Sequence, residues 1–112
     1  MKIIYNKYLP PKGFKAINLF GVVFARRNYG SLDIIEVNHE SIHTIQAREM
    51  LFVFFYVFYI VEWVFRLMQY RNFMMAYYNI SFEREAYDNQ NNMSYLADRK
   101  LYAFSKYLRK KS

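Results

Sequence analysis

The apolar positions near the start of the chain suit short β-strands. Residues 10–13, Pro-Pro-Lys-Gly, form a turn signal, and the stretch after them, Phe14–Ala25, is rich in residues that favour strands. Gly21 inside that stretch marks a bend or a bulge. We therefore expect a β-hairpin or two short strands here, followed by a loop at Arg26–Gly30.

The rest of the chain is predicted to be helical, because residues 31–112 contain neither Pro nor Gly. Asp33 is a good N-cap residue, and Glu36 three positions later completes the pattern of a capping box. A helix is therefore expected to begin after Asp33 and to run through residues 39–43.

Two further helices are expected toward the C-terminus. One is at Phe82–Gln90 with Ser81 as its N-cap, the other is at Tyr95–Lys110, and a break around residues 89–92 separates them. At 112 residues the chain is long enough for one core, so we expect a single domain spanning residues 1–112. The predicted fold class is α+β and mostly α.

The most apolar segment is an unbroken run from Met50 to Val61, inside a helix expected at Met50–Met68. Twelve helical residues rise about 18 Å, which is short of the roughly 30 Å of hydrocarbon in a bilayer. Three interpretations stay open: a buried central helix, a helix that meets a membrane surface or a second copy of the chain, and a membrane span. A weakly polar stripe runs along this helix at Tyr56, Tyr59, Glu62, Arg66 and Gln69.

The net charge of +7 is unevenly distributed. Residues 1–30 hold six Lys or Arg and no acid, residues 31–70 hold two against five acids, and residues 71–112 hold eight against four. Basic ends attract anionic surfaces. Basic and aromatic residues do not alternate along one periodic face, however, so we do not expect nucleic acid as a partner.

Composition also limits the compartment and the chemistry. The chain has no Cys, which excludes disulfides and a thiolate metal site. Lys2, Asn6 and Lys7 interrupt the first nine residues, so they lack the apolar stretch of a signal peptide. We expect a cytoplasmic protein, with membrane association through the Met50–Met68 helix as the alternative.

The only two histidines form the pattern His39-Glu40-Ser41-Ile42-His43. On a helix, residues four apart lie on one face about one turn apart, so both imidazoles can reach a single metal ion. Glu40 lies about 100° round the same helix and can reach a water at that ion. This H-E-x-x-H spacing is typical of zinc hydrolases, and it predicts a Zn²⁺ site with His39 and His43 as ligands and Glu40 as the general base.

Catalytic zinc usually has three protein ligands and one open position, so a third ligand is required. Because the chain has no Cys and no other His, that ligand must be a carboxylate. Glu83 and Glu85 are the best placed. Among residues beyond the motif helix, the candidates are Glu62, Glu83, Glu85, Asp88 and Asp98.

The motif and the downstream Glu-Arg-Glu-Ala stretch together resemble the gluzincin metallopeptidases. The matching residues are Asn38–Glu40 and Phe82–Tyr87, and the resemblance covers about residues 14–90. It implies a compact domain in which short β-structure precedes the active-site helix and a glutamate helix packs against that helix. By this resemblance Glu83 is the third zinc ligand, while Glu85, about 200° further round the helix, faces the surface.

The resemblance further implies zinc-dependent hydrolysis of a peptide or protein substrate. An edge strand before the active-site helix pairs with extended substrate in zincins, and Val22–Arg26 is the candidate for that strand. Tyr77 or Tyr78 is a candidate oxyanion donor. The family often has Asp where this chain has Tyr87, which leaves the group that orients a ligand histidine unidentified. The alternative is a non-catalytic metal-binding or membrane-surface protein in which the Met50–Met68 helix carries the function.

Overall fold

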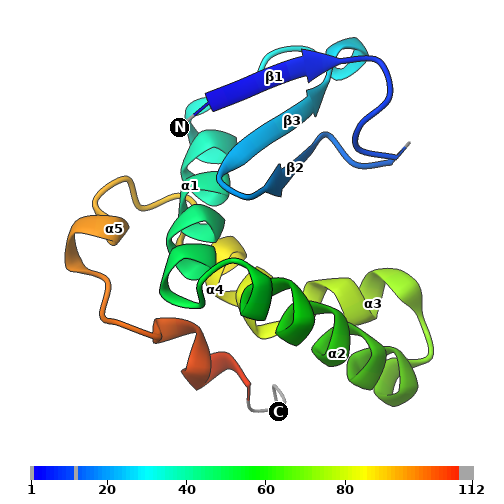
Figure 1. The fold of residues 1–112 in the computed structure, drawn as a ribbon, viewed down its shortest axis with the longest axis vertical. Coiled ribbons are helices and arrows are strands. Elements are labelled where there is room, and N and C mark those ends of the chain that lie inside the picture. The colour runs from blue at the N-terminus through cyan, green and yellow to red at the C-terminus, as the bar shows by residue number, and fades with distance from the viewer. Residues whose placement is uncertain (1, 12, 109–112) are drawn as a thin grey trace.

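The computed structural model describes residues 2–11 and 13–108, and it places a small sheet at one end of a group of helices (Figure 1). The fold is α+β and mostly helical, as expected from the sequence. Its elements in chain order are β1 (Lys2–Asn6), β2 (Ala16–Leu19), β3 (Val22–Arg26), the 3₁₀ turn η1 (Arg27–Tyr29), α1 (Ile34–Glu49), α2 (Val53–Tyr70), α3 (Phe73–Tyr78), α4 (Ser81–Asn89), α5 (Tyr95–Asp98) and the 3₁₀ turn η2 (Ala103–Tyr107).

The predicted hairpin is confirmed as β2 and β3, which pair antiparallel with Leu19 opposite Val22. The two residues between them, Phe20 and Gly21, have φ angles of 54° and 85°. Two positive φ angles in a two-residue loop are those of a type I′ turn, whose twist matches that of the flanking strands. Gly21 therefore marks a turn here.

The sheet has the strand order β1-β3-β2, with β1 parallel to β3. The strand at Lys2–Asn6 was missed by the sequence analysis, and its presence changes the role of the hairpin. Because β1 covers one side of β3, the strand Val22–Arg26 is central, and the expectation that it is the edge strand was wrong. The edge strand beside α1 is β2 (Figure 1).

Helix α1 begins where the sequence predicts. The Asp33 carboxylate accepts the Glu36 N–H at 2.8 Å, and the Glu36 carboxylate accepts the Asp33 N–H at 3.0 Å, so the capping box is complete. The helix ends at Glu49, and Leu51 and Phe52 follow with φ angles of 54° and 58°. This left-handed turn redirects the chain into α2.

Helix α2 is not a buried central helix. Among its eighteen residues only Phe55, Glu62 and Arg66 are buried, so the helix covers the core with one narrow side. That side contacts the core cluster of Ala47, Phe55, Ile80, Phe82 and Phe104, to which α1, α2, α4 and η2 contribute. The polar stripe predicted along the helix thus faces inward at Glu62 and Arg66.

Helix α4 is capped by a residue of another helix. Ser81 is its first helical residue rather than the N-cap that the sequence suggested. The Glu62 carboxylate of α2 accepts the Ser81 N–H at 2.9 Å and the Ser81 hydroxyl at 2.6 Å, and it also pairs with Arg66. Since the first N–H groups of a helix have no partner within it, Glu62 takes the place of a local cap.

The C-terminal part differs from the expected helix at Tyr95–Lys110. The described residues there form only the four-residue α5 and the 3₁₀ turn η2, and Lys110 lies outside the described residues. Side chains of this segment pack back onto the helices: the Arg99 guanidinium pairs with Glu49 of α1 and with Glu85 of α4. These long-range contacts explain why helix propensity alone did not predict the segment.

Replacing Glu62 by Ala should destabilise the fold strongly. The variant leaves Arg66 and the Ser81 N–H buried without the carboxylate, and breaking a buried pair costs about 3–5 kcal/mol. We expect a loss of that size in the free energy of unfolding measured with urea. Val57→Ala, at an exposed position of the same helix, should change it by less than about 0.5 kcal/mol. Equal losses in the two variants would contradict the capping role of Glu62.

Candidate metal centre

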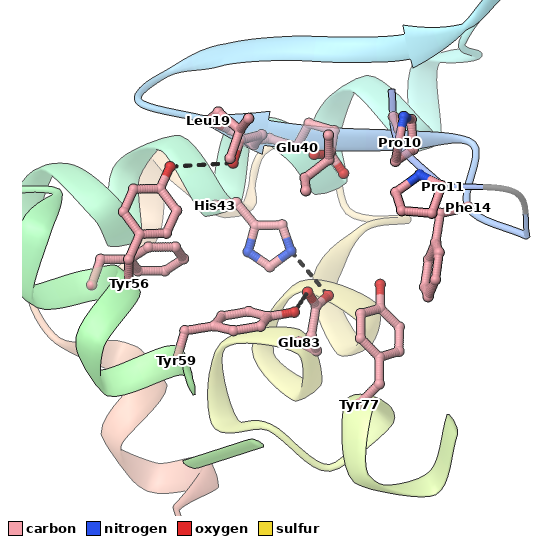
Figure 2. A pocket seen from close by; sticks show the side chains of 14 residues that line it. Pro10, Pro11, Phe14, Leu19, Glu40, His43, Tyr56, Tyr59, Tyr77 and Glu83 are labelled. Carbon is pink, nitrogen blue, oxygen red and sulfur yellow. Dashed lines mark hydrogen bonds and ion pairs between the residues drawn. The ribbon is translucent and has the colours of Figure 1, made fainter. Parts of the chain in front are cut away.

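The imidazoles of α1 and a carboxylate of α4 converge in the interior. Helix α1 carries His39 and His43 one turn apart, and the first turn of α4 brings Glu83 against them. Glu83 Oε1 lies 3.3 Å from His39 Nε2 and 3.0 Å from His43 Nε2, and the two Nε2 atoms are 3.1 Å apart. Figure 2 shows His43 and Tyr59 pointing toward Glu83. All three residues of the triangle are at most 6 % exposed.

The outer nitrogens of both rings are fixed by glutamine side chains. His39 Nδ1 lies 2.8 Å from Gln90 Oε1, and His43 Nδ1 lies 2.8 Å from Gln46 Oε1. Gln46 Nε2 donates to the Phe82 carbonyl and to Glu85, which leaves its oxygen as the group facing His43. Each Nδ1 therefore donates to its glutamine, and each Nε2 faces the other ring and Glu83, where it can bind a proton or a metal ion.

This triangle of donor atoms fits a metal ion. Two lone pairs and a carboxylate oxygen within 3.3 Å of one another repel unless a cation or a proton lies among them. Ligands at about 2.0–2.1 Å from a tetrahedral zinc are about 3.3 Å apart, which is close to the observed separations. Two imidazoles and one carboxylate are also a donor set that zinc accepts.

A second grouping involves the motif glutamate. His39, Glu40 and His43 are all buried, and their ligand atoms lie within 4.8 Å of one another, so these three could also hold a metal ion. Glu83 makes the shorter contacts, because its oxygen is within hydrogen-bond distance of both rings. The short separations favour Glu83 as the third ligand and leave Glu40 beside the centre.

The other candidate carboxylates are placed elsewhere. Glu62 caps α4, and Asp88 and Asp98 are exposed. The assignment of Glu85 to the surface was wrong: this residue is fully buried, and its carboxylate accepts hydrogen bonds from Gln46, Tyr95 and Arg99. Since α4 is packed on two sides, the side opposite Glu83 is interior as well.

The electrostatics follow from burying these charges together. Burial opposes protonation of His43, but the carboxylates of Glu83 and Glu40 outweigh it and raise the pKa of His43 to about 9. Burial would raise the pKa of Glu83, yet the two imidazoles hold it well below its usual range. Burial raises the pKa of Glu40 against the opposing effect of the histidines. A positive charge is thus favoured between the rings and Glu83.

Three tyrosines complete the surroundings. The Tyr59 hydroxyl donates to Glu83 Oε2 at 2.6 Å, which leaves Oε1 for the histidines. The Tyr87 ring packs edge-on against His39, with centroids 4.5 Å apart, and its hydroxyl contacts that of Tyr77 at 3.2 Å. Tyr87 therefore packs against the ring, whereas Gln90 is the residue that orients it. Gln46 and Gln90 were missed by the sequence analysis, because nothing in their local spacing marks them, and Tyr59 was identified only as part of the polar stripe of the Met50–Met68 helix.

A cavity of about 390 Å³ opens beside the centre (Figure 2). Its lining includes Glu40, His43 and Glu83, residues of the edge strand β2, Tyr59 and Tyr77, and Pro10, Pro11 and Phe14. A second cavity of about 290 Å³ contains His39, and Glu40 and Tyr77 line both. The centre thus borders two cavities.

Comparisons of the chain with protein-family models, with curated proteins and with solved structures give no match. Beyond the H-E-x-x-H spacing, which could bind a metal ion, no comparison supports the resemblance to gluzincins.

Replacing Gln46 by Leu should weaken metal binding at the candidate centre, tested with Zn²⁺ as the probe. The change removes the acceptor that holds His43 in the required tautomer, and losses of this kind are about 10–100-fold in metal affinity. Competition with a chromophoric chelator measures the affinity, and circular dichroism checks the fold. Gln69→Leu, which removes a glutamine far along α2, should leave the affinity unchanged. A similar affinity in both variants would show that Gln46 has no orienting role.

The metal-free protein should lose stability as the pH rises. The pKa of His43 is about 9 in the fold against an ordinary value of 6.5, so its protonation stabilises the fold fully below about pH 6.5 and not above about pH 9. We expect the free energy of unfolding in chelator to fall by a few kcal/mol across that window. His43→Gln should flatten the decline. A free energy of unfolding that rises between pH 6.5 and pH 9 would contradict the stabilisation of the fold by protonated His43.

Proposed function

We propose that this chain is a zinc-dependent metallopeptidase with His39, His43 and Glu83 as metal ligands and Glu40 as the general base. The observation that carries the proposal is the triangle formed by two Nε2 atoms and Glu83 Oε1, each pair 3.0–3.3 Å apart, at the wall of an open cleft. Zinc supplies Lewis acidity when bound there: it polarises a carbonyl and acidifies water.

The role of Glu40 follows from its position beside the ligands. Its carboxylate is buried next to both histidines and borders both cavities, so a water and a scissile carbonyl in the cleft are within its reach. Glu40 takes one proton from the water while the water oxygen bonds to the carbonyl carbon. Glu40 then gives that proton to the amine nitrogen as the C–N bond breaks. Peptide and water thus become a carboxylic acid and an amine.

Tyr77 is the better of the two candidates for an oxyanion donor. It lines both cavities, whereas Tyr78 is 47 % exposed and borders only the second. Burial, with Glu83 nearby, raises the pKa of Tyr77, so its hydroxyl keeps the proton that it would donate. Its contact with Tyr87 holds the hydroxyl near the cleft.

The substrate strand is proposed to lie along β2. The Arg26 N–H donates to the Lys15 carbonyl at 2.9 Å, so in the antiparallel alternation the N–H and C=O of Ala16 point away from β3. Ala16 and Asn18 both line the cleft that contains Glu40 and His43. An extended peptide can therefore pair with Ala16 at the edge of the sheet, as in other β-strand additions, whereas the Asn18 carbonyl already accepts from the Tyr56 hydroxyl at 3.3 Å.

The first test is the metal content of protein purified without added metal, measured by elemental mass spectrometry. We expect near-stoichiometric zinc in the wild type, and its loss in His43→Ala and in Glu83→Ala. Glu36→Gln, one turn before the motif, is the matched control and should keep its zinc. A wild type that holds no zinc after zinc is added back, or that holds iron instead, would overturn the proposal.

The second test separates an enzyme from a passive metal protein. Glu40→Gln should retain zinc and lose hydrolysis of a mixture of fluorogenic peptides, with a fall in kcat of about 10²–10⁴-fold. Glu36→Gln should cleave like the wild type, since its amide still accepts the Asp33 N–H. Zinc without any Glu40-dependent cleavage would favour a structural metal site.

A further inference from the structure

The outer face of α2 is apolar without interruption. Successive helical residues turn by about 100°, and on that basis eight large side chains fall within an arc of about 140°. Each is between 44 % and 74 % exposed: Val53, Phe54, Val57, Ile60, Val61, Val64, Phe65 and Met68. At roughly 100 Å² each they present on the order of 800 Å², against about 300–600 Å² for the largest patch on a typical monomer.

The charged residues of this helix all lie on its inner side. Glu62 is 6 % and Arg66 is 3 % exposed, and the pair is bound to Ser81 and to the Leu108 carbonyl. A surface helix of a water-soluble domain has the opposite arrangement, with apolar residues inward. Because α2 has the inverted pattern, its outer face exposes apolar side chains to water at a cost in free energy.

Neighbouring elements extend the apolar surface. Phe73 of α3 is 67 % exposed and stacks on Trp63 of α2, with ring centroids 5.9 Å apart. At the other end of α2, Phe20 of the hairpin turn packs on Phe52 and on Tyr56 while remaining largely exposed. In Figure 1, α2 and α3 lie together on the side of the molecule away from the sheet.

The charge around this face is positive. Arg48, in the last turn of α1, and Arg71, the C-cap of α2, are both exposed, so cations flank the roughly 27 Å of α2 on either side in the chain. Within residues 50–80 the only acid is the buried Glu62. Elsewhere in the part of the chain that the structure describes, the acids that are exposed are Asp33, Asp88 and Asp98.

From this arrangement we propose that the outer face of α2 docks on the surface of an anionic lipid bilayer, with the helix lying in the plane of the interface. The apolar stripe enters the boundary of head groups and acyl chains, and Arg48 and Arg71 contact lipid phosphates at its two ends. The inner side of the same helix carries Tyr56 and Tyr59 into the candidate cleft, so docking holds the cleft at the membrane surface.

A transmembrane orientation fits the contacts less well. Among the described residues, α2 is the one helix long and apolar enough to cross a bilayer by length and composition. Crossing would place Glu62 and Arg66 in the hydrocarbon, or would strip them from Ser81 and Leu108 and uncap α4. Docking flat leaves all of these contacts intact.

The test is flotation of the full chain with vesicles, which does not depend on metal or on catalysis. We expect binding to phosphatidylcholine vesicles that contain phosphatidylglycerol, and at least about tenfold weaker binding without it. Val61→Asp on the face should lower binding at least about tenfold. Leu101→Asp, at a comparably exposed apolar position outside the face, is the matched control and should bind like the wild type. Arg48→Gln with Arg71→Gln should reduce the preference for anionic vesicles.

Several results would overturn the proposal. These are a wild type that binds neither kind of vesicle, and equal losses in Val61→Asp and Leu101→Asp. A dimer by sedimentation that Val61→Asp converts to a monomer, without vesicle binding, would assign the face to a second copy. Trp63 is the only tryptophan, so quenching by lipids brominated at different depths locates the helix. Strongest quenching at the bilayer centre would indicate a span and exclude docking in the interface.

Discussion

The carboxylate of Glu62 determines where the glutamate helix begins. By accepting both the N–H and the hydroxyl of Ser81, it replaces the local cap that α4 lacks, and its pairing with Arg66 satisfies its own charge. A helix that begins at Ser81 has Glu83 in its first turn, where this side chain meets the two histidines of α1. The candidate centre therefore depends on a contact between α2 and α4 that includes none of its ligands.

A chain of buried polar contacts links the opposite side of α4 to the same centre. Arg99 pairs with Glu85, Glu85 accepts from Gln46, and Gln46 in turn holds His43. Buried charges of this kind are stable only when each one is matched by a partner. The network couples the irregular C-terminal segment to the imidazole orientation, which gives that segment a role beyond covering the core.

The local features were predictable because neighbouring residues determine them. The i,i+4 spacing of His39 and His43, the capping box at Asp33 and the hairpin around Gly21 all follow from backbone geometry over a few residues. The central position of β3 was not predictable, since β3 would also be an edge strand if the distant segment β1 did not pair along its other side. The same reasoning applies to Glu85, whose burial depends on Arg99.

By itself, then, the sequence determined the pair of imidazoles and the adjacent glutamate on one helix, and it left carboxylates as the partners for a third ligand of the proposed zinc site, because these depend on residue type and helical period. Only the tertiary structure decided that Glu83 is the carboxylate that reaches the rings, that Gln46 and Gln90 orient them, and that α2 turns its charges inward. The physical reason is that the sequence pattern states which faces a helix has, while the packing of α1, α2 and α4 determines which face meets which neighbour.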